Sequence, residues 1–236
     1  MKNKLVIIGA NDFQNQLILK AKSLGYEAHV FAWEEGAVGK ETADFFYPVS
    51  IVEKEEILRY CRKIEPCGIC SIASDLASIT VNYVAENLGL PCNKTVYSEI
   101  QTNKYLMREA LSNAGVSCPR FVRVGKEFDA SLLKDFTFPI IVKPTDRSGS
   151  RNIMKLESVV GLSEAVSAAC DSSFEHKAII EEYIDGNEYS METITQNGVH
   201  QYLATTKKYT TGAPYFIETG HCQPSDLTDD VNNRAI

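Results

Sequence analysis

Residues 140–151, IIVKPTDRSGSR, join a short apolar run to a loop of small and cationic residues. The branched apolar residues before Lys143 are typical of a buried strand. Pro144 lacks a backbone donor, so we expect the strand to end there. Because lysine is rarely buried without a partner, the Lys143 ammonium should project into a cleft.

The loop after this strand contains the groups that a phosphate requires. It offers backbone N–H donors, the hydroxyls of Ser148 and Ser150, and Gly149 for a sharp turn. The Walker pattern G-x-x-x-x-G-K-[ST] is absent. Taken alone, the loop fits a surface hairpin as well as a phosphate site.

Composition limits the classes of partner. The chain has 236 residues, enough for one large or two small domains, and a formal net charge of −7 from 31 acids and 24 bases. This charge argues against nucleic acid as a partner, so a bound anion must be held by a local site. No apolar run approaches the roughly 20 residues of a membrane span. Seven cysteines, an odd number, indicate reduced thiols and a cytoplasmic location.

The pair Cys67 and Cys70, in CGIC, has two interpretations. A C-x-x-C can be a redox or zinc motif, but no second pair stands at zinc-finger spacing and the four histidines are scattered. The apolar surroundings favour a buried strand, in which free cysteine behaves as a small hydrophobic residue.

The first 95 residues alternate strand and helix patterns. Strands are expected at 4–9, 27–33 and 68–74, and helices at 11–25, 54–64 and 76–89. This order implies right-handed crossovers and a doubly wound parallel sheet with helices on both faces.

The first turn, GANDFQ, does not suit a dinucleotide. Only Gly9 is present where the Rossmann fingerprint has three glycines. Asn11 and Gln14 place side chains where a pyrophosphate needs close approach to the backbone. We therefore expect a Rossmann-like domain without that cofactor, and an NAD-binding oxidoreductase is the weakest interpretation.

A domain boundary is expected near residue 95, giving domains 1–95 and 96–236. Ser98 followed by Gln101 resembles a capping box that opens one helix ending at Gly115.

An ordered set of motifs follows in the second domain. Lys104 lies on that helix, Lys143 ends a strand, and residues 177–194 indicate a strand, a polar hinge at 181–186 and a second strand. This set resembles the ATP-grasp superfamily, in particular the branch with carbamoyl-phosphate synthase large subunits, biotin carboxylases and amino-acid ligases. The resemblance implies an α/β protein, with a Rossmann-like pre-ATP-grasp domain followed by an α+β ATP-grasp domain that is incomplete at its C-terminus.

The resemblance also implies residues that bind the phosphates of ATP. Lys104 and Lys143 match the two lysines that contact the nucleotide phosphates. Ser148, Gly149 and Ser150 match the small-residue loop, here 144–153, that folds over them.

Further matches concern the nucleoside. Glu181, Glu182 and Ile184 match the hinge that binds adenine, although the family often has lysine at the position of Glu182. Glu188 matches the acid that holds the ribose hydroxyls.

The segment ETGHCQP, 218–224, resembles the E-x-G-H-x-x-P of amino-acid-ligase-like members, where it borders the reacting end of the nucleotide. Candidates for catalysis or for contact with the acceptor are Lys207, Lys208, Glu218 and His221. Each is equally a candidate for an ordinary surface role.

The family's magnesium ligands normally follow this segment, so we expect them beyond Ile236 and assign no metal ligand within the chain. Thr228 followed by acids indicates the start of a helix. We therefore expect a C-terminally truncated chain that is inactive by itself.

The resemblance implies an ATP- and Mg²⁺-dependent ligase that joins a small carboxylate to an amine through an acyl phosphate. Bringing two like charges together costs about 4 kcal/mol per close pair at an effective dielectric near 20, and cations must offset that cost. The alternatives are a bicarbonate-phosphorylating enzyme similar to carbamoyl-phosphate synthase or biotin carboxylase, and a non-catalytic ATP-binding module. No membrane or nucleic-acid partner is expected, and the family often forms homodimers.

Overall fold

The computed structural model describes residues 3–235. The chain divides into two compact units, Met1–Met107 and Arg108–Ile236, and this division falls inside helix α5, Lys104–Asn113. The domain boundary expected near residue 95 stays a prediction. No helix among residues 3–235 is long and apolar enough to cross a membrane.

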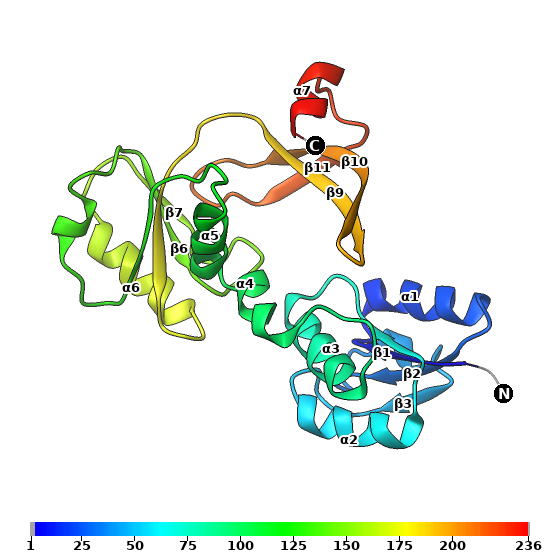
Figure 1. The fold of residues 1–236 in the computed structure, drawn as a ribbon. Coiled ribbons are helices and arrows are strands. Elements are labelled where there is room, and N and C mark those ends of the chain that lie inside the picture. The colour runs from blue at the N-terminus through cyan, green and yellow to red at the C-terminus, as the bar shows by residue number, and fades with distance from the viewer. Residues whose placement is uncertain (1–2, 236) are drawn as a thin grey trace. The chain divides into compact units, whose positions relative to one another are not determined.

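Four short parallel strands form the sheet of the first unit (Figure 1). Their order is β3-β2-β1-β4, with β1 Lys4–Ile8, β2 Glu27–Phe31, β3 Phe45–Tyr47 and β4 Gly68–Cys70. The sequence predicted three of these strands. It missed β3, which has only three residues and is too short to show a pattern of alternation.

Several helical segments belong to this unit. They are α1 Asp12–Ser23, η1 Val38–Lys40, α2 Lys54–Ile64, α3 Asp75–Leu88, η2 Thr95–Tyr97, α4 Ser98–Thr102 and the start of α5. Successive residues of β1 point to opposite faces of the sheet. Ile7 packs with Ile18 of α1, whereas Val6 and Ile8 pack with residues of α2 and α3 such as Ile57 and Val84. The helices therefore cover both faces, as predicted.

The prediction of a single helix ending at Gly115 is wrong, because two helices, α4 and α5, occupy that stretch. Asn103 separates them with an extended backbone (φ −105°, ψ 116°), and its Oδ1 accepts hydrogen bonds from the Tyr105 and Leu106 amides at 3.0 and 3.2 Å. The Ser98–Gln101 capping box does not form, since Ser98 lies inside α4 and its hydroxyl is buried without a partner among the described residues. An interruption of a single residue leaves little trace in apolar periodicity.

An antiparallel sheet of order β5-β8-β6-β7 forms the first part of the second unit. Its strands are β5 Phe121–Val124, β6 Ile140–Pro144, β7 Met154–Leu156 and β8 Ala178–Glu182. Helix α6, Leu162–Ser172, packs on the face that carries Ile140, Val142 and Ile180. Strand β6 ends at Pro144, as predicted, and its other face carries Ile141 and Lys143.

A three-stranded antiparallel sheet completes this unit, in the order β11-β10-β9. Its strands are β9 Glu188–Gln196, β10 Val199–Thr210 and β11 Glu218–Cys222; the short helices are η3 Ala130–Leu133 and α7 Asp229–Ala235. Asn197 and Gly198 join β9 to β10 with φ of +52° and +77°, the conformation of a tight hairpin turn. Thr228 caps α7 as expected, since its hydroxyl accepts a hydrogen bond from the Val231 amide.

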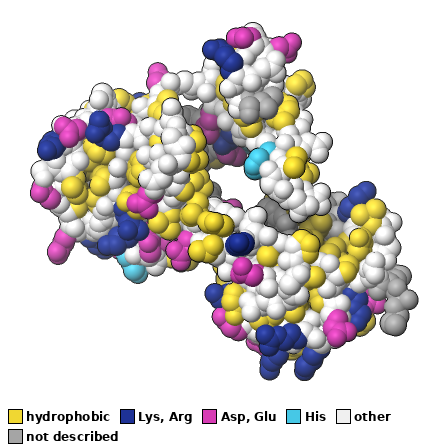
Figure 2. Space-filling model, viewed as in Figure 1, with side chains coloured by type: hydrophobic (Ala, Val, Ile, Leu, Met, Phe, Trp, Pro, Cys, Tyr) yellow, Lys and Arg dark blue, Asp and Glu magenta, His cyan; other side chains and the backbone are white. Residues whose placement is uncertain are grey.

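Charged side chains of both signs occur on the surface in view in Figure 2. Figure 2 shows Lys and Arg side chains intermixed with Asp and Glu on each unit. The predicted binding of an anion therefore depends on particular pockets.

Candidate functional site

A pocket of about 230 Å³ lies in the second unit, beside the polar face of β6. It is lined by Ile141, Lys143, Ser150, Ile153, Tyr183, Glu188, Lys208, Thr210, Phe216 and Glu218. Both sheets of the unit contribute residues, together with the loop after β6 and the residue that follows β8. The pocket therefore combines apolar side chains with two lysines and two carboxylates.

Lys143 is the next-to-last residue of β6 and lines the pocket, where Glu181 holds its ammonium group. Glu181 is 3% exposed; one carboxylate oxygen contacts the Lys143 ammonium, and the other accepts a hydrogen bond from Arg108 Nε at 2.6 Å. Burial alone would raise the pKa of Glu181, but Lys143 and Arg108 outweigh it and hold this pKa below its usual range. Two cations share one anion, so the group carries a surplus positive charge.

A second charged group lies at the start of β9 and the end of β10. The Lys208 ammonium lies 2.8 Å from a Glu188 carboxylate oxygen and 2.7 Å from one of Glu218. Burial lowers the pKa of Lys208, but the hydrogen bonds to these carboxylates raise it more. His221 Nε2 lies 3.6 Å from Glu218. The three predicted residues Lys208, Glu218 and His221 are therefore together.

Lys207 belongs to a different cluster. Successive residues of a strand point to opposite faces, and the Lys207 ammonium donates a hydrogen bond to Asp226. Tyr189 also donates a hydrogen bond to Asp226. Lys207 does not line the pocket that holds Lys208.

The loop after β6 contributes one of its two predicted hydroxyls. Ser150, with φ of +52°, donates its hydroxyl hydrogen to the Phe216 carbonyl at 2.8 Å and lines the pocket. Ser148 and Gly149 are exposed and do not line it. Their predicted contact with phosphate stays a prediction.

The predicted adenine hinge is only partly beside the pocket. Glu182 Oε1 accepts a hydrogen bond from the Thr137 amide at 2.8 Å, and Ile184 is 70% exposed. Tyr183, between them, lines the pocket, and its ring centroid lies 6.4 Å from that of Phe216. Lys104 begins α5 in the first unit. Its part in phosphate binding stays a prediction.

Sequence reasoning missed several residues of this group. Ile141 shares a strand face with Lys143, and that spacing of two residues was a usable signal. Tyr183 lies within the predicted hinge, 181–186, between two residues assigned to adenine binding. Arg108 and Phe216 approach Glu181 and Ser150 from segments far along the chain, and no local pattern signals such pairings.

Residues 136–235 match the family model described as an ATP-grasp domain. The fold agrees, since it resembles the crystal structure of N5-carboxyaminoimidazole synthetase from Staphylococcus aureus complexed with ADP. That likeness has a TM-score of 0.81 and 15% identity, and covers all of this chain and 62% of the other.

Two curated relatives are similar in sequence. Formate-dependent phosphoribosylglycinamide formyltransferase of Prochlorococcus marinus is 23% identical over 260 residues, covering 100% of this chain and 61% of that protein. D-alanine–D-alanine ligase of Alcanivorax borkumensis is 29% identical over 158 residues, covering 65% of this chain and 49% of that protein. This chain therefore spans about half to three fifths of the length of these relatives.

Proposed function

We propose that the pocket beside Lys143 binds ATP, and that the protein is an ATP-dependent ligase that joins a small carboxylate to an amine. The observation that carries the proposal is the surplus positive charge of the Lys143–Glu181–Arg108 group, placed where Lys143 lines a pocket together with apolar and aromatic side chains. A nucleotide requires this combination: a cation for its phosphates and flat apolar contacts for its base.

The residues present fit a nucleotide. Ile141, Ile153, Tyr183 and Phe216 offer surfaces for a purine ring. The volume of about 230 Å³ is below the roughly 300–1,000 Å³ of whole-ligand pockets, so it suits the nucleoside end, with the phosphates extending along Lys143. Glu188 is placed to accept hydrogen bonds from ribose hydroxyls once it is released from Lys208.

In the proposed reaction, the γ-phosphoryl group passes to a carboxylate oxygen, and an amine then displaces phosphate from the resulting acyl phosphate. Such transfers are catalysed mainly by positioning and by stabilisation of charge. Lys143 and Lys208 would supply that charge. Magnesium would neutralise the triphosphate further. No group of three or more His, Cys, Asp or Glu side chains that could hold a metal ion occurs among residues 3–235.

The two curated relatives support the ligase class. One is named for joining D-alanine to D-alanine, and the other is named for a formate-dependent transfer; each name contains a carboxylate substrate. We prefer the carboxylate–amine reaction to phosphorylation of bicarbonate for this reason. We also propose that the substrates are a small carboxylate and an amine. The candidates for catalytic residues are Lys207, Glu218 and His221.

A binding experiment tests the pocket directly. Lys143→Met keeps the apolar stem and removes the ammonium, so we expect the increase in Tm caused by ATP to disappear. In the unaltered protein, a hundredfold excess of ligand over Kd should stabilise the folded state by about 2.7 kcal/mol.

The exposed Lys134, in the same unit, provides the matched control. Lys134→Met should retain the full ATP shift. If Lys143→Met, folded as judged by circular dichroism, retains it as well, then Lys143 does not bind the nucleotide. ADP release in the presence of candidate carboxylates and amines separately tests the ligase reaction.

A further inference from the structure

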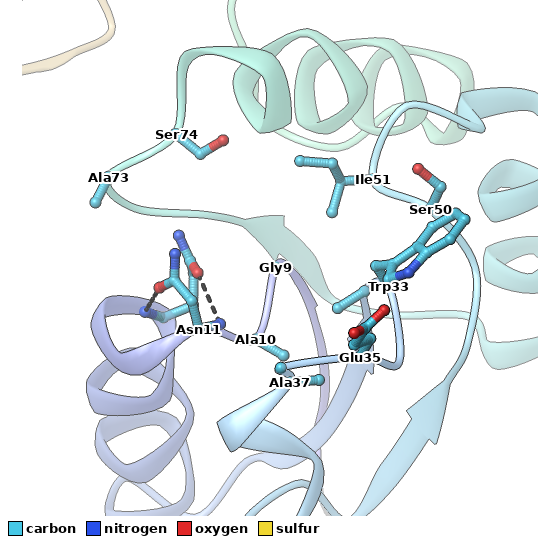
Figure 3. A pocket seen from close by; sticks show the side chains of 13 residues that line it. Gly9, Ala10, Asn11, Trp33, Glu35, Ala37, Ser50, Ile51, Ala73 and Ser74 are labelled. Atoms are coloured by element: carbon cyan, nitrogen blue, oxygen red, sulfur yellow. Dashed lines mark hydrogen bonds between the residues drawn. The ribbon is translucent and has the colours of Figure 1, made fainter. Parts of the chain in front are cut away.

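The first unit contains a pocket of its own, of about 250 Å³. It lies at the carboxyl ends of parallel strands, with walls from the loops after β1, β2 and β4 and from the segment after β3 (Figure 3). In open parallel sheets, ligands bind outside this edge. The position therefore indicates a binding site, and the side chains indicate the chemistry of its ligand.

The pocket is unsuited to phosphate. Among residues 3–235, no lysine or arginine lines it. The amides at the start of α1 are already used, because Asn11 Oδ1 accepts from Phe13 and Gln14 at 2.9 and 3.3 Å, and Gln14 Oε1 accepts from the Asn11 amide at 3.1 Å. Gly9, with φ of +99°, allows this arrangement, since a Cβ there would lie 2.9 Å from the Gln14 side chain. An anion would meet neither a cation nor a free helix N-terminus.

The pocket offers a carboxylate instead. Glu35 lines it and has no ion-pair partner among residues 3–235. Its neighbour Glu34 is different, because the Glu34 carboxylate is paired with Lys40 at 2.8 Å. Glu35 is therefore the acid available for a cationic ligand.

Two more groups suit such a ligand. Trp33 is 67% exposed, and an indole face attracts cations. The Ser50 hydroxyl makes no hydrogen bond within the described part of the chain. Figure 3 shows Trp33, Glu35 and Ser50 gathered on one side of the pocket, with Asn11 and Ser74 across from them.

We propose that this pocket binds the primary ammonium group of a small organic molecule. Glu35 accepts one N–H and balances the charge, the Ser50 hydroxyl oxygen accepts another, and the ligand packs against the face of Trp33. The volume of about 250 Å³ accommodates a small organic molecule such as an amino acid or an amino alcohol. The proposal goes beyond ATP binding and is independent of it, since the two pockets share no residue.

Trp33 makes the test specific, because it is the chain's only tryptophan. We expect ethanolamine, titrated at neutral pH and constant ionic strength, to change the tryptophan fluorescence with saturation. Tetramethylammonium has the same charge but no N–H donor, and should bind about tenfold more weakly or worse. Inorganic phosphate should cause no saturable change.

Glu35→Gln should weaken ethanolamine binding about tenfold or more while leaving Tm unchanged. Glu34→Gln is the matched control and should bind ethanolamine as the unaltered protein does. The proposal is overturned by saturable binding of phosphate, by equal binding of tetramethylammonium, by an unchanged affinity in Glu35→Gln, or by no response to ethanolamine.

Discussion

At the scale of single residues, Glu181 organises the predicted nucleotide pocket. A buried carboxylate is costly unless it is paired and hydrogen-bonded, and here Lys143 and Arg108 provide both. The ion pair with Glu181 thereby fixes the lysine at the pocket. Arg108 matters because it prevents Glu181 from cancelling the positive charge of Lys143 at the pocket.

This arrangement predicts how stability depends on pH. The pKa of Glu181 is lowered from its ordinary value of 4.5, so its contribution to the free energy of unfolding is full above that value. The contribution is lost as pH falls from 4.5 through the lower pKa of the folded state.

Arg108→Met should therefore lower the free energy of unfolding at pH 7 by about 1–3 kcal/mol, since it removes one charged partner of a buried group. The deficit should shrink below the pKa of Glu181 in the folded state, where the carboxyl is neutral. Urea denaturation at pH 7 and in acid measures both. A deficit that is the same at all pH values would mean that Arg108 acts through packing alone.

At the scale of elements, the break between α4 and α5 shows where local patterns fail. Ser98 and Gln101 have the spacing of a capping box, but the cap that forms belongs to Asn103. Asparagine is as good an N-cap as serine, so the sequence contained the signal. Propensity could not choose between the two because the preceding turn, η2, decides where α4 begins.

The Asn103 cap can be tested by mutation, with Gln101 of the predicted Ser98–Gln101 capping box as the control. Asn103→Ala should lower the free energy of unfolding by about 1 kcal/mol, the usual value of an N-cap. Asn103→Asp keeps the acceptor and should retain most of that stability. Gln101 is exposed, so Gln101→Ala should change it by less than about 0.5 kcal/mol. A larger effect of Gln101→Ala would restore the capping box; denaturant midpoints decide.

Other elements were predictable for a physical reason. Strand β6 has a face buried against α6 and ends in proline, so composition and periodicity agree over the whole strand. The pocket is different, because its aromatic and cationic neighbours join through sheet pairing. Lys208 meets Glu188 and Glu218 since β10 pairs with both β9 and β11. The resemblance supplied these residues, but only the fold places them in one cluster.

At the scale of the whole molecule, two independently built cores each carry a pocket. The first is a parallel sheet with helices on both faces, and its pocket carries a carboxylate without a cation. The second joins two antiparallel sheets, and its pocket has lysines. The second pocket contains two lysines beside Glu188 and Glu218, whereas Glu35 lines the first with no lysine or arginine among its described residues, so we expect the two pockets to bind different ligands.

Hydrogen exchange followed by mass spectrometry can locate the binding site of each ligand in the same protein. ATP should slow exchange in segments that line the second pocket, around 141–143, 150–153, 183–188 and 208–218, because binding stabilises local structure against opening. If Lys104 contacts the phosphates as the resemblance implies, the first turn of α5 is protected too. Ethanolamine should instead protect 33–37 and 50–51. Protection of the same peptides by both ligands would contradict the assignment of two separate sites, because neither pocket contains a residue of the other.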